Sequence, residues 1–412
     1  MSTKQTTSAL NRSSAKQARA IAPLTLLVVV GALMTVSALA TDAMLPAFPA
    51  MAAYFGVSDA SIQSVVSVFM LGYALPHLIV GSLADRFGRR PVLLVGLGIY
   101  LIGSVVSWAA PTLTMLLLGR FVQGLGASAG PILARAVLRD LYQGRELGRM
   151  LSFAMIFFAA APLLAPAVGS LLLNVAEWRA IFLFLVAVAV ALALLVWLVL
   201  PETAVERDPN ALRLRGIWTN GRLIFTNPTS AWTVVVMALS YAGLMAYLLS
   251  APALYMGYFG LDATGFAIVF AGVASTTFFA QPLNVRLLRR YAPADILRFT
   301  APAFVVVSLV LVAQVALGAV TLWSFVVNLM AFFVTFSLIL GNGTAVALDP
   351  HKQRAGMASG LMGFAQLSLG TALGSFVAAF ADQGPLPLAL GLAVLSLLAY
   401  PALSAAFRRK AV

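Results

Sequence analysis

Apolar segments of about 20 residues recur along almost the whole chain. A helix of that length spans the hydrocarbon core of a bilayer and satisfies its own backbone hydrogen bonds there. Of the 412 residues, 61% are hydrophobic and 9% are charged, whereas about 25% are charged in soluble domains. The sequence therefore predicts an all-α polytopic membrane protein whose principal partner is the lipid bilayer.

Twelve such segments can be placed on the sequence. In the first half we expect spans at 22–46, 60–80, 92–110, 113–134, 148–172 and 179–200. In the second half we expect them at 229–252, 263–284, 297–317, 321–345, 356–379 and 386–407. The polar stretch 201–228 then becomes a cytoplasmic linker between two six-helix bundles. The predicted domains are a tail at 1–21, bundles at 22–200 and 229–407, and a tail at 408–412.

The basic residues predict the orientation of these spans. All but two of the 26 Lys and Arg residues, Arg120 and Arg179, fall in the tails or in loops on one side. By the positive-inside rule that side is the cytoplasm, so both termini are expected inside. A signal peptide cleaved after Ala40 is an alternative, but it would leave an odd number of spans.

The residue inventory argues against several kinds of function. The formal charge of +13 is scattered over short loops, so it does not indicate a nucleic-acid partner. The chain has no cysteine and two histidines, too few for a histidine-rich metal site. It also lacks a Gly-x-x-x-x-Gly-Lys-Ser/Thr loop, so we expect no nucleotide and no other cofactor. A membrane-embedded enzyme or a receptor is a weaker alternative, since neither a nucleophile constellation nor a sizeable extramembrane domain is evident.

A short charged segment, 81–90, joins two apolar runs. Gly81 and Gly88 permit tight or left-handed backbone, and Asp85 can cap a helix or pair with an arginine. The segment also carries three basic side chains: Arg86, Arg89 and Arg90. We expect a cytoplasmic loop whose charge contacts bias the equilibrium between two conformations of the protein.

Two ionisable residues fall inside predicted spans, where a charge is costly and is a functional candidate by default. Asp42 lies near the outer end of the first span. Arg120 lies about eight residues, or roughly 12 Å, below the outer end of the fourth. Their similar depths suggest proton coupling through Asp42, with Arg120 as its partner. Alternatively, Asp42 caps its helix at the interface and Arg120 is a structural residue bonded to carbonyl groups.

Small and polar residues give further candidates inside the spans. In the fourth span they are Gln123 and Gly124, close to Arg120. In the fifth they are Pro162, Pro166 and Gly169, which would bend the helix and permit close helix contact. Ordinary small-residue packing is the alternative. Aromatic, Met and polar side chains that could line a substrate cavity are Met34, Ser37, Phe69, Tyr73, Phe153, Tyr241, Met245, Asn342 and Gln366.

These patterns resemble known motifs. The segment 81–90 resembles the Gly-x-Leu-Ala-Asp-Arg-x-Gly-Arg-Lys loop between helices 2 and 3 of the major facilitator superfamily, with Arg90 replacing lysine. Residues 117–127 match its Leu-x-x-Arg-x-x-Gln-Gly-x-Gly-Ala motif. Residues 161–170 resemble the Gly-x-x-x-Gly-Pro-x-x-Gly-Gly motif of drug:proton antiporters, with alanine for two glycines and serine for the last. Together with Thr41-Asp42, Pro46, Glu177-Trp178-Arg179 and Pro201-Glu202-Thr203, they make the chain similar to the Bcr/CflA family of bacterial drug-resistance transporters.

This resemblance implies a major facilitator fold, in which two six-helix bundles rock around a central cavity to alternate access. It implies proton-driven export of amphiphilic antibacterial, drug-like compounds by a monomer in the bacterial inner membrane. Asp42 would then alternate between protonated and ionised forms as Arg120 and solvent access change. The alternative within transport is proton-coupled movement of one metabolite, such as a sugar or a nucleoside.

Overall fold

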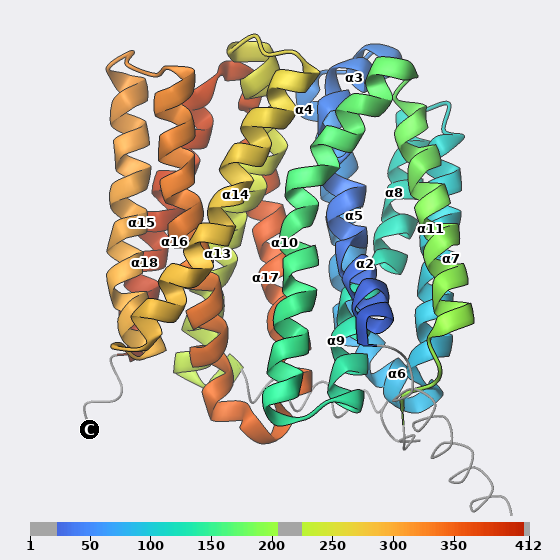
Figure 1. Cartoon of the computed structure of the whole chain (residues 1–412). Helices are drawn as coiled ribbons and strands as arrows, with labels where there is room; N and C mark the ends of the chain where they lie inside the picture. The colour runs from blue at the N-terminus through green and yellow to red at the C-terminus, as the bar shows by residue number, and fades with distance from the viewer. Residues whose placement is uncertain (1–22, 205–224, 408–412) are drawn as a thin grey trace, which may run out of the picture. The chain divides into compact units, whose positions relative to one another are not determined.

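The computed structural model describes residues 23–204 and 225–407, and within these ranges it contains helices and no strand (Figure 1). Twelve helical segments are long and apolar enough to cross a membrane. The predicted all-α, polytopic class with twelve spans is therefore confirmed. The predicted tails, 1–21 and 408–412, and most of the predicted linker lie outside the described residues.

The described residues group into two compact units. The first unit takes its residues from Met1–Ala43, Val68–Ala165 and Val175–Ile217. The second takes them from Met44–Ser67, Pro166–Asn174 and Trp218–Val412. The turn between the first two spans thus packs with helices from the second half of the chain, a grouping that the sequence does not reveal.

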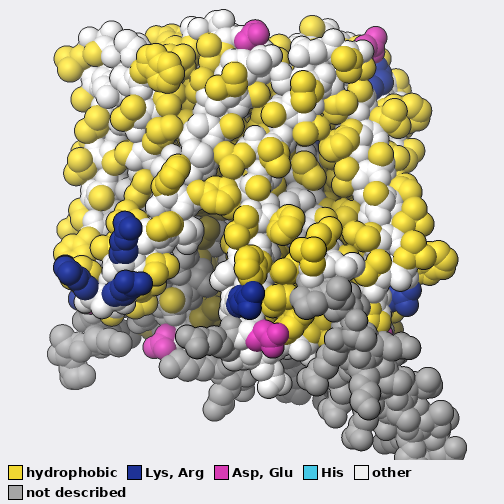
Figure 2. All heavy atoms as spheres, in the orientation of Figure 1, with side chains coloured by type: hydrophobic (Ala, Val, Ile, Leu, Met, Phe, Trp, Pro, Cys, Tyr) yellow, Lys and Arg dark blue, Asp and Glu magenta, His cyan; other side chains and the backbone are white. Residues whose placement is uncertain are grey.

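The first half of the chain supplies most of the first unit. The helices in this half of the chain are α2 (Pro23–Asp42), η1 (Leu45–Ala47), α3 (Phe48–Phe55), α4 (Asp59–Ile62), α5 (Ser64–Ala74), η2 (Leu75–Leu78), α6 (Val80–Phe87), α7 (Arg89–Trp108), α8 (Leu113–Ala127), α9 (Ala129–Leu141), α10 (Gly144–Val175) and α11 (Arg179–Val199). Figure 2 shows hydrophobic side chains over the middle of the visible face and charged side chains near its ends, as a bilayer requires.

The second half of the chain belongs to the second unit. Its helices are α13 (Pro228–Pro252), η3 (Ala253–Tyr258), α14 (Ala263–Leu288), α15 (Pro293–Ala316), α16 (Leu322–Leu348), η4 (Asp349–Arg354), α17 (Ala355–Ala378), η5 (Ala381–Gln383) and α18 (Pro385–Phe407). The segment η3 is a π-helical turn, wider than the α-helix that it extends.

Polar side chains start several of the spanning helices. Thr112 accepts a backbone N–H from the first turn of α8 at 3.3 Å. Asn227 does the same for α13 at 3.1 Å, and Thr321 and Ser324 form a reciprocal capping box at α16. These side chains satisfy N–H groups that have no partner within the first helical turn. The helices therefore begin at polar residues just outside the apolar runs.

Four predicted spans end well before the helical segments do. The first continues through η1 and α3 to Phe55, the fourth reaches Leu141, the seventh reaches Tyr258 and the tenth reaches His351. The predicted spans end where the apolar run is already long enough to cross a bilayer. A helix needs only its own hydrogen bonds and a packing surface, so it can continue beyond the hydrocarbon region.

The prediction of a loop at 81–90 is wrong. Residues up to Phe87 belong to α6, and Arg89 already begins α7. The two helices are joined at Gly88, whose φ of 104° lies where only glycine is comfortable. Gly81 lies inside α6 and has no positive φ, so the demand for glycine falls on Gly88 alone.

Candidate functional site

Arg120 is the largest fully buried side chain of the described residues, with 0% of its surface exposed. Its Nη1 donates to Oε1 of Gln123, one turn further along α8. Gln123 Nε2 in turn donates to Oγ of Ser104 on α7 over 2.7 Å. The Ser104 hydroxyl donates to the carbonyl oxygen of Tyr100, also over 2.7 Å. A continuous set of hydrogen bonds therefore ties the buried cation to the neighbouring helix.

Two aromatic rings also lie close to this cation. The Cζ atom of Arg120 lies 4.3 Å from the ring centroid of Phe69 on α5, and 6.0 Å from that of Phe182 on α11. A guanidinium over a ring face gains electrostatic stabilisation that grows when water is excluded. Gly124 makes this approach possible, because a Cβ there would collide with the backbone carbonyl of Phe69. Phe69, predicted to line a cavity, thus packs beneath Arg120.

Asp42 is the last residue of α2 and is 3% exposed. The hydroxyl of Thr41 donates to its Oδ1 over 2.8 Å. Asp42 makes no ion pair with any residue in 23–204 or 225–407, so it does not bond Arg120 directly. The first unit therefore buries an acid and a base on separate helices, each held by its own polar neighbours.

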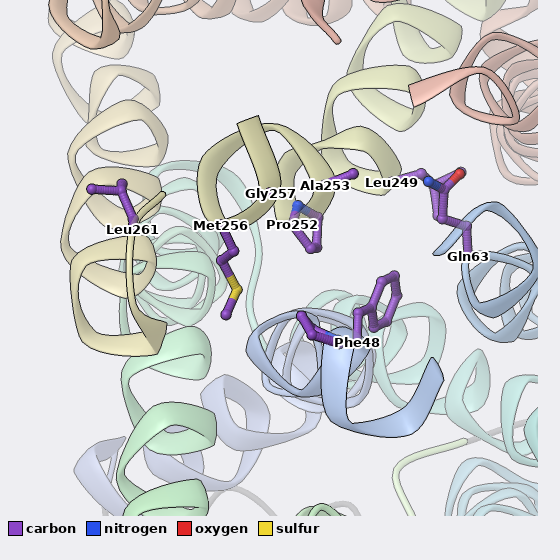
Figure 3. Close-up of a pocket in the computed structure, with 9 residues that line it drawn as sticks. Phe48, Gln63, Leu249, Pro252, Ala253, Met256, Gly257 and Leu261 are labelled. Atoms are coloured by element: carbon purple, nitrogen blue, oxygen red, sulfur yellow. The ribbon is translucent and has the colours of Figure 1, made fainter. Parts of the chain in front are cut away.

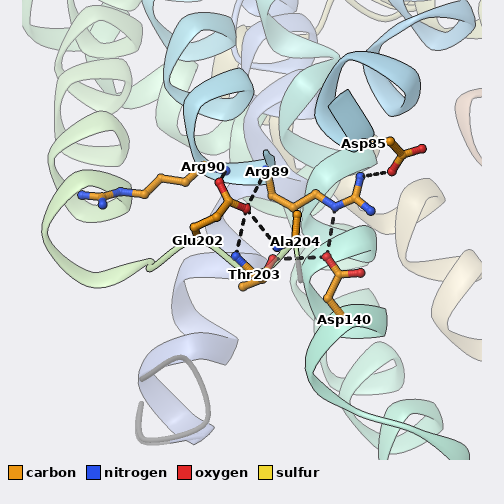
Figure 4. Close-up of polar contacts among 7 residues, drawn as sticks. All are labelled: Asp85, Arg89, Arg90, Asp140, Glu202, Thr203 and Ala204. Carbon is orange, nitrogen blue, oxygen red and sulfur yellow. Dashed lines mark hydrogen bonds and ion pairs between the residues drawn. The ribbon is translucent and has the colours of Figure 1, made fainter. Parts of the chain in front are cut away.

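A charged cluster lies where α6, α7, α9 and the end of α11 meet (Figure 4). Arg89 is its centre. Its Nη1 lies 2.6 Å from Oδ1 of Asp85, and its Nε lies 3.0 Å from Oδ2 of Asp140. The Thr203 hydroxyl also donates to Asp140 Oδ2 over 3.2 Å. Because the Arg89 side chain is only 15% exposed, these contacts are less screened than surface ion pairs.

Glu202 holds the first turn of α7 in this cluster. Its Oε1 accepts the backbone N–H of Arg89 at 2.8 Å, and also those of Thr203 and Ala204 at 2.9 Å each. Its Oε2 accepts the backbone N–H of Arg90 at 3.3 Å. A carboxylate at a helix N-terminus satisfies unpaired N–H groups and opposes the positive end of the helix dipole. Glu202 thereby fastens the segment after α11 to the start of α7.

Gly88 leaves the space that this carboxylate occupies. A Cβ at Gly88 would lie 2.8 Å from Cδ of Glu202, closer than real Cβ contacts allow. The positive φ at Gly88 excludes other residues as well. Two independent constraints, backbone conformation and space, therefore meet at this one residue.

The remaining predicted charges lie at the edge of the cluster. Arg90 Nη2 donates to the backbone carbonyl of Trp197, so its side chain contacts α11. Arg86 is exposed, and its Cζ lies 5.3 Å from the ring centroid of Phe87. Of the three predicted arginines, Arg89 is the one whose side chain forms ion pairs with carboxylates in the described residues.

The predicted cavity residues are distributed over both units. Met34, Ser37, Phe69 and Tyr73 are buried in the first unit, whereas Met245 and Asn342 are buried in the second. The others are partly exposed, and they are Phe153, Tyr241 and Gln366. Asn342 Nδ2 donates to Oδ1 of Asn284 over 2.8 Å, which joins α16 to α14.

The span 5 residues Pro162, Pro166 and Gly169 all lie within the single helix α10. Ser170, in the same motif, lies 3.5 Å from the Thr264 hydroxyl of α14, oxygen to oxygen. The residues that sequence reasoning missed are Asp140 and the capping role of Glu202. The triplet Pro201-Glu202-Thr203 was a usable signal, since an acid after a proline at the end of a span invites a capping role.

Comparison with known proteins identifies the family. Residues 30–375 match the model of the Major Facilitator Superfamily. This chain therefore belongs to the Major Facilitator Superfamily, a class of polytopic transporters.

Three bacterial relatives align with most of the chain. The Bicyclomycin resistance protein homolog of Haemophilus influenzae is 29% identical over 365 residues, which are 87% of this chain and 91% of the relative. The Multidrug resistance protein MdtL of Shewanella oneidensis is 30% identical, with 79% and 81% covered. The Multidrug resistance protein D of Escherichia coli K12 is 28% identical, with 90% and 93% covered.

Solved structures support the fold. The nucleoside transporter NupG superimposes with a TM-score of 0.73 at 15% identity, covering 94% of this chain and all of that one. The human organic anion transporter MFSD10 gives 0.71 at 16% identity, covering 92% and 99%. The predicted major facilitator fold is therefore confirmed.

Proposed function

We propose that this protein is a multidrug exporter of the bacterial inner membrane, which moves amphiphilic antibacterial compounds outward in exchange for protons. The names of the three bacterial relatives support the cargo class. The observation that carries proton exchange is the burial of Asp42, 3% exposed, in the same unit as the fully buried Arg120. Buried ionisable groups in spanning helices mark ion and proton pathways.

In this mechanism Asp42 exchanges a proton with the aqueous phase that the protein faces. Ionised Asp42 attracts a cationic compound, and a neutral compound competes with the proton by occupying the adjacent space. Arg120 responds to the change in charge, through water or through a shift of its Gln123 contact. Its ties to α5, α7 and α11 carry that response into the packing of the first unit.

The Arg89 cluster supplies the conformational element. We place it on the cytoplasmic side together with both termini, because the basic residues gather there. Two six-helix bundles, 22–200 and 229–407, would rock about the linker as a monomer. The contacts of Arg89 with Asp85 and Asp140 would then favour one of the transport states.

Growth of efflux-deficient bacteria on a panel of amphiphilic antibacterials tests this function. Expression of the chain should raise tolerance to several unrelated compounds, and Asp42→Asn at equal protein level should not. Tolerance to none, together with proton-coupled uptake of one sugar or nucleoside, would favour the single-metabolite alternative.

A further inference from the structure

A cavity of about 280 Å³ lies in the second unit, and neither Asp42 nor Arg120 is among its lining residues. Nine residues line it, and they come from two stretches, 48–63 and 249–261. Figure 3 shows the Phe48 ring and the Met256 side chain pointing into the space between the helices that carry them. The cavity is at the end of α13 remote from the linker, which the proposed topology places on the outer side.

One wall of the cavity is the π-helical turn η3. It follows Pro252, whose ring nitrogen cannot donate the hydrogen bond that would continue the α-helix. The wider turn shows in the bond from the Phe259 N–H to the carbonyl of Leu254, five residues back, at 2.9 Å. Gly257 lies in this turn, and a Cβ there would meet no atom within 4 Å. π-Turns inside helices are frequent at functional sites, and this one borders open space.

Gln63 gives the cavity a polar group. Its side chain is 3% exposed and lies at one end of the cavity, facing α13 (Figure 3). Neither its amide oxygen nor its amide nitrogen has a hydrogen-bond partner among the described residues. Buried amides are normally bonded, because an unpaired donor or acceptor loses its water without compensation. An unpaired carboxamide beside an open cavity therefore points to a bound partner.

The chemistry of the lining defines that partner. Apart from Gln63 the lining is Phe, Pro, Leu, Ala, Met and Gly, so no charged side chain awaits an ion. A carboxamide carries an acceptor oxygen and an NH₂ donor on the same carbon, so it can pair with the C=O and N–H groups of a second amide. The volume is just below the usual range for drug-sized ligands, and therefore suits one ring or one arm of a larger compound.

We propose that this cavity binds the amide or lactam group of a neutral apolar compound, with Gln63 as the hydrogen-bonding residue. If the proposed function holds, the cavity is an outer subsite for exported cargo, lined by residues other than Asp42 and Arg120. Only that transport role rests on the proposed function, whereas binding is a property of the cavity itself.

Photolabelling of the full chain in lipid nanodiscs tests binding without transport. The first probe is a benzamide bearing a trifluoromethyl-diazirine. The second, called the benzene probe, is the same labelled phenyl ring without the amide. Mass spectrometry then locates the adducts. We expect the benzamide probe to label 48–63 and 249–261 about tenfold more than the benzene probe does, because only the former bonds Gln63. Adducts of both probes spread alike over lipid-facing helices would overturn the proposal.

Two variants and a control sharpen this test. Gln63→Leu removes the unpaired amide without opening the core, and it should lower benzamide labelling about tenfold while leaving benzene labelling unchanged. Gly257→Leu fills the open space and should remove cavity labelling by both probes. Gly98→Leu, also at a glycine with no atom within 4 Å of its Cβ but on α7, should label as wild type does. Wild-type labelling in Gln63→Leu would contradict the assignment of Gln63 as the hydrogen-bonding residue.

Cavity labelling that persists in a chain exporting no drug would overturn the proposed function alone.

Discussion

The carboxylate of Glu202 accepts the backbone N–H of Arg89 at 2.8 Å, across 113 positions of sequence. One side chain thus joins the segment after the sixth span to the start of the third. The same carboxylate bonds its own following backbone, so it is held in place before it meets α7. This contact is therefore a fixed joint of the first unit.

Glu202→Gln tests the charge of that joint. Glutamine keeps an acceptor oxygen but loses the negative charge at the N-terminus of α7, and its NH₂ group would face the Arg90 N–H. We expect a loss of about 1 kcal/mol in the free energy of unfolding. Glu177→Gln is the matched control, because the Glu177 side chain is 83% exposed. Thermal unfolding in detergent should give Glu202→Gln the lower melting temperature. Equal melting temperatures would show that the charge of Glu202 at the start of α7 does not stabilise the protein.

Gly88 and Gly81 should respond in opposite directions to alanine. Gly88→Ala meets both a positive φ and the Glu202 carboxylate, and should cost roughly 1–3 kcal/mol. Gly81→Ala lies within α6 with no atom within 4 Å of its Cβ, and should stabilise by roughly 0.5–1 kcal/mol. Melting temperatures therefore rank Gly81→Ala first, wild type second and Gly88→Ala last. A Gly88→Ala protein as stable as wild type would show that this turn is not constrained.

The two acids that contact Arg89 should contribute unequally to the stability of the protein. The Asp140 side chain is 21% exposed and also accepts from Thr203, whereas the Asp85 side chain is 49% exposed. Asp85→Asn should therefore cost up to about 1 kcal/mol of stability, and Asp140→Asn should cost more. Both should slow drug export more than they reduce the amount of protein in the membrane. Export at the wild-type rate per molecule in both variants would remove the gating role of the cluster.

The sequence predicted the twelve spans because each is a long and predominantly apolar run, which is the pattern typical of a membrane-spanning helix. It also singled out Asp42 and Arg120 as functional candidates, because a charge within such a run is rare, and their roles stay predictions. It did not predict that α6 continues to Phe87, since charged residues at a helix end look like those of a loop. The Glu202 contact and the Gln63 cavity depend on tertiary packing between distant segments, which no local pattern encodes.

The geometry of Arg120 predicts that its shape matters as well as its charge. Lysine would keep the positive charge but lose the planar fork that bonds Gln123 and stacks on Phe69. Arg120→Lys should thus abolish export, as Arg120→Ala should. It should also destabilise the protein by about 1–3 kcal/mol by leaving the buried Oε1 of Gln123 without its donor. Export assays at equal protein level decide whether the shape of the Arg120 side chain matters or only its charge. Retention of export by Arg120→Lys would mean that charge alone suffices.

Proton release on drug binding tests the central claim most directly. Purified wild-type protein in weakly buffered detergent solution, at a pH where Asp42 holds its proton, should release protons when a cationic drug is added. Asp42→Asn should bind the drug, as monitored by native tryptophan fluorescence, and release none. Proton release by Asp42→Asn equal to that of wild type, at equal drug occupancy, would contradict the assignment of Asp42 as the proton site.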